Sequence, residues 1–282
     1  MIRIIAPAML VTAISMAAVA APKHAAKKHI LVVTWTTGFR HADTIGPNPS
    51  QDGPAQKILK DLGDSSGAFD VDYCRSQDDV KSMLTADGLK KYDGVFFANT
   101  TGNLGIPDLK AFCDWIKAGH AFMGTHSAGD TYHPSDAGGD TAYIDMVGCE
   151  FRTHGAQAEV QCFVEDPKHP AVKHWPSSFT IKDEIYHFRV NNRPTVHVLL
   201  ALKTQGMDGV RDPKTNEDTS GKPTDMLISW CKNYGKGKVF YTALGHRPDV
   251  WARPDYQQHL LGGIKWALGL EKGSAKTPSD TK

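Results

Sequence analysis

One heptapeptide carries the clearest chemical signal in this 282-residue chain, the segment Gly124–Asp130 that follows the apolar run Ala121–Met123. A short segment of small residues directly after a strand is typical of a nucleophile elbow, in which a sharp turn pushes one side chain into a cleft. The residue at the apex is His126, which cannot form the ester or thioester that such elbows serve. We therefore expect an exposed imidazole that acts as a metal ligand or as an acid or base.

Other histidines could join His126. His41 ends a turn after the first predicted strand, His246 follows an apolar strand, and His154 lies in a loop. Neutral imidazole is a favoured ligand of zinc and related ions, so His41, His126, His154 and His246 could together hold a divalent metal such as zinc. Without a metal, the same groups could exchange protons near pH 7. No short signature such as His-Glu-x-x-His is present, so the cofactor stays open.

Carboxylates lie at two places where they could assist these imidazoles. Asp130 comes four residues after His126 and could orient its ring or cap a helix. Asp183 and Glu184 are adjacent, so in an extended segment they point in opposite directions, and we expect Glu184 to face the cleft. We assign the acid/base chemistry to His126, His246, Glu184 and Asp130.

Four more residues are candidates for ligand binding. Arg40 could bind an anionic or hydroxyl-rich group, or form a surface ion pair. Asn99 and Thr100 offer neutral donors and acceptors suited to hydroxyls, or form a polar turn. Tyr186 could present a flat face to a ring, although most aromatic side chains serve packing.

Strands and helices alternate through the first half of the chain. Apolar runs predict strands at 29–35, 69–74, 93–99 and 121–125, and helical spacing predicts helices at 55–62, 78–91 and 107–119. This alternation predicts an α/β fold with a mostly parallel, twisted sheet and helices on both faces. Ligands of such sheets bind at the carboxyl ends of the strands. We therefore expect His41, His126 and His246 to meet in one cleft there.

The later part is less regular and β-rich. Strands are predicted at 159–165 and 197–202, a hairpin at 226–231 and 238–244, and a short acidic-apolar element at 183–186. A polar loop at 203–222 and a closing helix at 256–268 complete the pattern.

The chain ends are expected to lie outside the folded domain. A positive start, an apolar run and a small-x-small site predict a signal peptide at 1–20, hence a secreted or periplasmic protein. A basic linker at 21–28, one domain at 29–270 and a flexible tail at 271–282 follow.

The net charge of +1 argues against a nucleic-acid partner, and no second apolar segment has membrane-spanning length. Five cysteines allow one or two disulfides and leave at least one thiol, with Cys113 expected in the core.

Four collinear segments resemble the trehalose-utilisation (ThuA-like) family: the Gly124–Asp130 elbow, Phe151–His154, Asp183–Tyr186 and Gly235–His246. Gly38–His41 and Gly263–Ala267 fit the two ends of its pattern. The resemblance implies a fold similar to class I glutamine amidotransferases (flavodoxin-like), in which the elbow holds a catalytic cysteine. Because His126 stands at that position, glutaminase activity should be absent.

The resemblance also implies a role in trehalose or keto-sugar metabolism. Combined with the histidines, it favours an enzyme of hydrolase, lyase or isomerase type that performs acid/base or metal-assisted chemistry on a sugar. A non-catalytic sugar-binding protein and a partner of a sugar-oxidising enzyme remain as alternatives. The expected partner is a small-molecule carbohydrate, with no nucleic acid and no membrane after signal cleavage. The sequence also allows a homo-oligomer.

Overall fold

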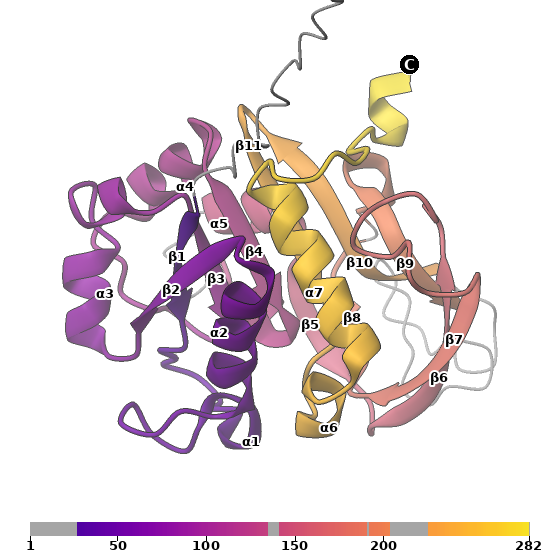
Figure 1. The fold of residues 1–282 in the computed structure, drawn as a ribbon, viewed down its shortest axis with the longest axis horizontal. Helices are drawn as coiled ribbons and strands as arrows, with labels where there is room; N and C mark the ends of the chain where they lie inside the picture. Colours follow the sequence, from indigo (N-terminus) through magenta and orange to yellow (C-terminus); the bar gives the residue numbers. More distant parts are fainter. Residues whose placement is uncertain (1–26, 135–140, 191, 204–224, 282) are drawn as a thin grey trace, which may run out of the picture.

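The computed structural model describes residues 27–134, 141–190, 192–203 and 225–281 (Figure 1). The predicted signal peptide lies outside the described residues, as does nearly all of the predicted linker and of the loop at 203–222. Within the described ranges, no helix combines the length and apolar character that crossing a membrane requires.

A nine-stranded sheet in the order β2-β1-β3-β4-β11-β10-β9-β6-β7 forms the centre of the molecule. Its first five strands are parallel: β2 (Phe69–Cys74), β1 (Lys28–Val33), β3 (Gly94–Ala98), β4 (Ala121–Thr125) and β11 (Gly237–Thr242). The last four are antiparallel to their neighbours: β10 (Asp225–Tyr234), β9 (His197–Lys203), β6 (Ala158–Val164) and β7 (Ser178–Asp183). The sheet is thus mixed, with the predicted parallel arrangement in the half that carries the elbow.

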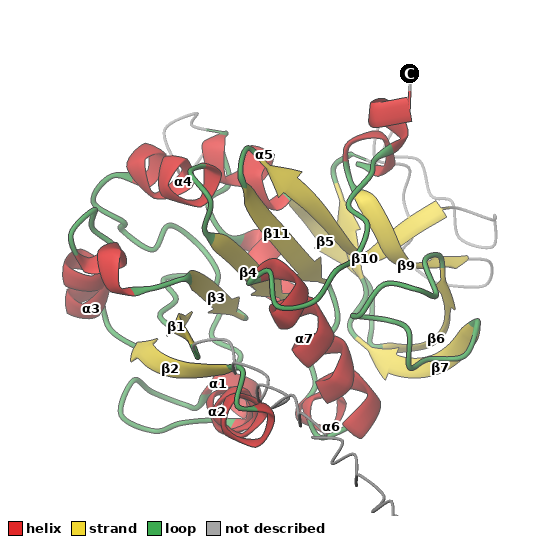
Figure 2. Ribbon diagram, turned by 45° about the horizontal axis from the view of Figure 1, so that its top comes forward, coloured by secondary structure: helices red, strands yellow, loops and turns green. Residues whose placement is uncertain are grey.

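Helices cover both faces of the parallel half. One face carries α1 (Ala42–Ile45), α2 (Pro54–Ser66), α6 (Pro248–Trp251) and α7 (Pro254–Ala267), whose apolar residues share one buried cluster. The other carries α3 (Gln77–Met83), α4 (Leu109–Lys117) and α5 (Ala142–Val147), packed in a second cluster. Figure 2 shows β6 and β7 at the opposite side of the molecule from α3. These layers confirm the predicted α/β class.

Local patterns explain where the central elements begin and end. Every residue of β3 and β4 is buried, as expected for apolar strands covered on both faces. The helix α4 begins after Asp108, whose side chain accepts a hydrogen bond from the N–H of Ala111. The hairpin of β10 and β11 turns at Gly235, which has a φ of 62°.

Several segments differ from the sequence prediction, among them β7 (Ser178–Asp183), where no strand was predicted. The helix expected at 78–91 is divided into α3 and the 3-10 helix η1 (Gly88–Lys91), because the chain turns back at Gly88, where a side chain would meet the carbonyl of Ser82. A two-stranded sheet of β5 (Phe151–His154) and β8 (Tyr186–Phe188) was not predicted. Within the expected flexible tail, Ala275 is buried and the carbonyl of Ser274 accepts a hydrogen bond from Cys231.

All five cysteines lie in the described ranges, and each is a buried free thiol. Cys113 packs in the core, as the sequence indicated. The disulfides that the sequence allowed are therefore absent from this part of the chain.

Candidate functional site

The elbow is a sharp turn between β4 and the 3-10 helix η2 (His126–Asp130). His126 has a φ of 44°, a conformation that residues other than glycine rarely adopt and that is common at functional sites. The hydroxyl of Tyr241 donates a hydrogen bond to the carbonyl of His126 at 2.5 Å and so holds the turn. A side chain at Gly129 would meet that hydroxyl, so the small residue lets the elbow pack beneath Tyr241.

His126 is buried within the site, whereas the elbow motif had predicted an exposed side chain. Its side chain is 0 % exposed, because the ring of Tyr186 packs over it at a centroid distance of 4.1 Å. Its Nδ1 lies 2.9 Å from the carbonyl oxygen of Ala243. A carbonyl can only accept, so Nδ1 carries the proton and Nε2 faces the site.

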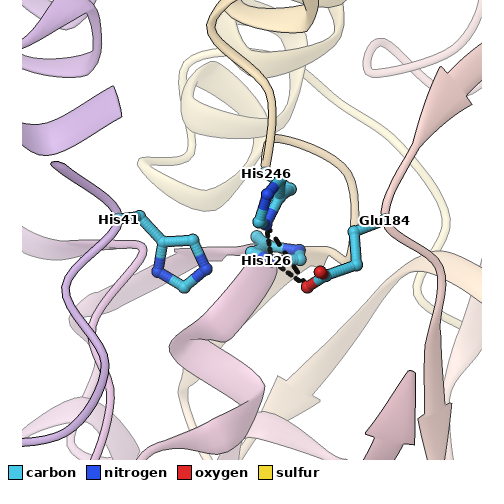
Figure 3. A group of neighbouring side chains, drawn as sticks. All are labelled: His41, His126, Glu184 and His246. Atoms are coloured by element: carbon cyan, nitrogen blue, oxygen red, sulfur yellow. Dashed lines mark hydrogen bonds and ion pairs between the residues drawn. The ribbon is translucent and has the colours of Figure 1, made fainter. Parts of the chain in front are cut away.

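Glu184 and His246 meet His126 at this free nitrogen (Figure 3). The Oε2 atom of Glu184 lies 3.3 Å from His126 Nε2 and 3.3 Å from His246 Nδ1. The two nitrogens are 3.2 Å apart. Three polar atoms from distant parts of the chain thus form a nearly equilateral triangle.

His41 closes the open side of this triangle. It comes from the loop between β1 and α1, and its ring centroid lies 4.9 Å from that of His126 and 5.1 Å from that of His246. The three imidazoles are close to perpendicular to one another, with interplanar angles of 77–89°. One ligand atom from each ring and one from Glu184 all lie within 4.8 Å of one another. We call His41, His126, Glu184 and His246 the histidine-glutamate cluster.

Asp183 stabilises the loop that carries His246. Its carboxylate is fully buried and accepts hydrogen bonds from the backbone N–H groups of Gly245 at 2.7 Å and Arg247 at 3.3 Å. These bonds fix the loop that carries His246 against the end of β7, and the next residue is Glu184. Sequence reasoning considered Asp183 only as the residue that would face away from the cleft.

Burial and charge set the protonation of the cluster. Burial raises the pKa of Glu184, but its close contacts with His126 and His246 outweigh burial and hold this pKa well below the usual range. Burial lowers the pKa of His41 to about 2, aided by the neighbouring His126 and His246, so this ring is neutral. Burial alone would lower the pKa of His246, but the hydrogen bond and charge of Glu184 raise it. Burial raises the pKa of Asp183.

The cluster contains three of the four predicted metal ligands, and His154 lies just outside it. The Nδ1 atom of His154 lies 3.2 Å from Glu184 Oε1, the carboxylate oxygen that faces away from the triangle. Among the predicted catalytic residues, Asp130 does not contact the ring of His126. Its carboxylate instead bonds to Nε2 of His133 at 2.5 Å, three residues further along the chain and beyond the end of η2.

The predicted ligand-binding residues have mostly structural partners. Arg40 donates its guanidinium hydrogens to the carbonyls of Thr34, Ile45 and Gly46. Asn99 is fully buried and bonds to Thr44 of α1, Thr125 of β4 and the carbonyl of Gly245 after β11. Thr100 is buried and bonds to Thr131. The structure thus places Asn99 and Thr100 beneath the site, whereas Tyr186 packs directly on His126.

One aromatic residue that sequence reasoning left out lies at the edge of the cluster. Phe39 is 68 % exposed, and its ring meets His41 edge-on at a centroid distance of 4.9 Å. The sequence could have indicated Phe39 as a site residue, because it belongs to the turn that carries Arg40 and His41. An exposed aromatic side chain beside polar groups is suited to contact a ligand ring.

The fold and the site together define a class of protein. A parallel sheet with a strained turn after a central strand has the architecture of amidotransferase-like α/β proteins, and here imidazoles and a carboxylate occupy the position of the nucleophile. Such a set can bind a cation or transfer protons, but it lacks the thiol needed for acyl transfer.

The comparison with family models identifies the chain more closely. The ThuA family model, described as trehalose utilisation, matches residues 29–267, and the chain therefore belongs to this family. A ThuA-like protein from Bacteroides uniformis has a similar structure, with a TM-score of 0.64 and 21 % identity over 88 % of this chain and 95 % of that chain. One from Parabacteroides merdae gives a TM-score of 0.61 and 19 % identity over 90 % and 96 % of the two chains. A search of curated proteins found no match.

Proposed function

We propose that this ThuA-family protein is an enzyme of carbohydrate metabolism that acts on trehalose or a keto-sugar derived from a related disaccharide. The observation that supports this proposal is the histidine-glutamate cluster, which gathers titratable groups from four separate segments of the chain around one point. The family description, trehalose utilisation, supports the substrate class. The reaction would be acid/base or metal-assisted chemistry of hydrolase, lyase or isomerase type.

The geometry suggests how protons would move in such a reaction. The side chain of His246 is 20 % exposed and pairs with Glu184, whose low pKa keeps a negative charge beside the ring. Without an ion in the site, this charge favours the protonated form of His246, which could donate a proton to a leaving or carbonyl oxygen and take one back later. His126 is buried, and its Nε2 lies 3.3 Å from Oε2 of Glu184. Enolisation of a keto-sugar and hydrolysis both fit this exchange.

Phe39 supports the choice of a sugar over a small inorganic substrate. Its exposed ring stands at the edge of the cluster, where an apolar face could stack on the C–H groups of a sugar ring while the hydroxyls reach the imidazoles. Stacking of this kind would orient the sugar without adding charge.

Two further proposals follow from the sequence. The pattern of residues 1–20 supports export, hence a secreted or periplasmic site of action. The histidine at the elbow supports the absence of glutaminase activity, because no nucleophile stands at the apex.

The test is turnover of trehalose, other disaccharides and their oxidised keto forms by the wild-type protein and by His246→Ala. Loss of an acid/base group should lower turnover by roughly 10²-fold or more. The control is His133→Ala, which removes an imidazole bonded to Asp130 and Glu150 outside the cluster. Sugar binding without any turnover by the wild type would instead indicate a sugar-binding protein. Unchanged turnover in His246→Ala would refute the assignment.

A further inference from the structure

We propose that the histidine-glutamate cluster is a binding site for one divalent transition-metal ion, with His41, His126, Glu184 and His246 as its four ligands. This inference names a cofactor for the site of the proposed function, but it rests on the geometry of the cluster and not on the identity of a sugar. It also replaces His154 of the sequence prediction by Glu184 as the fourth ligand.

The distances within the triangle match those around a small metal ion. Zinc lies about 2.0–2.1 Å from nitrogen and oxygen ligands, so the ligand atoms of a tetrahedral site are about 3.3–3.4 Å apart. The three separations among His126 Nε2, His246 Nδ1 and Glu184 Oε2 are 3.2, 3.3 and 3.3 Å. Three atoms are thus already spaced as three corners of such a tetrahedron.

His41 is placed to supply the fourth corner. Its ring faces the triangle, and the centroids of the three imidazoles lie 4.9–5.1 Å from one another (Figure 3). Its Nδ1 lies 3.3 Å from the hydroxyl of Ser127, which leaves Nε2 for the metal. His41 lies farther from the other ligands than they lie from one another, because the ligand atoms of all four residues are within 4.8 Å, whereas the three atoms of the triangle are 3.2–3.3 Å apart. Binding would draw His41 inward.

The hydrogen bonds of the cluster leave lone pairs aimed at one another. His126 donates Nδ1–H to the carbonyl of Ala243, so a neutral His126 presents the lone pair of Nε2 to the carboxylate of Glu184. Two acceptors at 3.3 Å repel unless a positive charge lies between them. A metal ion supplies this charge and satisfies Glu184, His126 and His246 at once.

The surroundings of the ligands resemble those of known metal sites. Metal-bound histidines usually donate their second nitrogen to a carbonyl or another acceptor, which fixes the ring, as Ala243 does for His126. The second oxygen of Glu184 faces Nδ1 of His154 at 3.2 Å, which fixes the carboxylate. The buried charge of Glu184, with Asp183 behind it, adds a field that attracts a cation.

The donor set points to the class of metal. Three imidazoles and one carboxylate, without thiolate, suit zinc and its first-row neighbours and not magnesium or calcium, which prefer oxygen ligands. With these four ligands in place, a bound ion would polarise a carbonyl or hydroxyl oxygen of the sugar by taking it as a fifth ligand, an expansion that catalytic zinc sites allow.

The experiment measures metal before any sugar is added. The protein is purified without metal-chelating resin, and metal per chain is measured by inductively coupled plasma mass spectrometry. Chelator-treated protein is then titrated calorimetrically with Zn²⁺ and, for comparison, Mg²⁺. We expect one Zn²⁺ per chain, no comparable Mg²⁺ binding, and a higher thermal midpoint with Zn²⁺ because the ion binds the folded state.

Variants decide whether the ion sits in the cluster. Glu184→Gln keeps the shape of the side chain, and His246→Ala changes a partly exposed one, so both should fold. Each should weaken Zn²⁺ binding by more than the roughly 10–100-fold typical of losing a supporting contact. His133→Ala, whose imidazole bonds to Asp130 and Glu150, should bind as the wild type does. Absence of Zn²⁺ binding by the wild type, or equal binding by Glu184→Gln, would overturn the inference.

The two proposals can fail separately. Zinc binding in the cluster without turnover of any sugar would leave the metal site in place and remove the enzyme proposal. Full sugar turnover by chelator-treated, metal-free protein would leave the enzyme proposal in place and show that the cluster works as a proton relay without an ion.

Discussion

The carboxylate of Asp183 accepts a hydrogen bond from the backbone N–H of Gly245 at 2.7 Å, which joins the end of β7 to the loop after β11. These two segments carry Glu184 and His246, the two members of the cluster that face each other. The bond is fully buried, so its geometry sets the distance between an acid and a base that lie 62 residues apart.

Replacing Asp183 by alanine should therefore loosen the site and the fold together. The variant leaves the buried N–H of Gly245 without its acceptor, which we expect to lower the free energy of unfolding by roughly 1–3 kcal/mol. The measurement is urea denaturation, with zinc titration of the same preparation. Asp249→Ala is the matched control, because Asp249 is an exposed carboxylate that pairs with Arg247 in the neighbouring turn and should change stability little. An equal loss in both variants would contradict the role of Asp183.

Phe39→Ala should affect substrate binding but not folding. The side chain is 68 % exposed, so the free energy of unfolding should change by no more than about 0.5 kcal/mol. Loss of a stacking surface worth about 1 kcal/mol should raise KM for the sugar a few-fold with little change in kcat. Val190→Ala, which alters another exposed apolar residue, provides the control. If both variants leave KM unchanged, Phe39 does not contact the substrate.

Stability should fall as the pH decreases below the ordinary pKa of histidine. Burial lowers the pKa of His259 to about 3, and its Nδ1 donates to the carbonyl of Ala171. Between about pH 6.5 and 3 the unfolded chain binds a proton at this residue that the folded chain excludes. The stabilising contribution is therefore complete above about pH 6.5 and declines toward pH 3.

The slope of the unfolding free energy against pH tests whether His259 causes this loss of stability. One proton bound only by the unfolded state changes the unfolding free energy by about 1.4 kcal/mol per pH unit. Urea denaturation between pH 7 and 4 should show a smaller slope for His259→Phe, which cannot titrate, than for the wild type. Identical slopes would mean that other groups carry the acid sensitivity, such as His169, whose burial lowers its pKa to about 4.

The cysteines should be inert in the folded protein. Burial raises the pKa of Cys149 well above its ordinary value and that of Cys162 to about 12. We expect no reaction of the native protein with a thiol reagent, reaction of all five thiols after unfolding in guanidinium, and no ammonia release from glutamine. Rapid modification of one native thiol together with ammonia release would contradict this prediction and indicate glutaminase chemistry at that thiol.

The order of strands and helices up to residue 125 could be predicted because its signals are local. Runs of apolar residues bounded by turn residues placed β2 and β4 at their observed bounds. The rule that ligands gather at the carboxyl ends of parallel strands then predicted that His41, His126 and His246 would meet, since each follows such a strand. The hairpin of β10 and β11 was predicted in the same way.

Several features depend on contacts that no local pattern records. β7 pairs only with β6 at the far edge of the sheet, yet its end reaches the loop after β11 through Asp183, and this long-range contact brings Glu184 into the cluster. The alternation of Phe179 and Ile181 in β7 could have predicted the strand, but not its destination.

The sequence by itself determined which side chains were available and at which strand ends they would stand. The tertiary structure decided which of them touch. His126 is buried and not exposed, because Tyr186 of the separate β8 strand covers it. Asp130 pairs with His133, whereas Glu184 pairs with His126. The physical reason is that hydrogen bonds between distant segments form only where packing of the apolar layers has already brought those segments together.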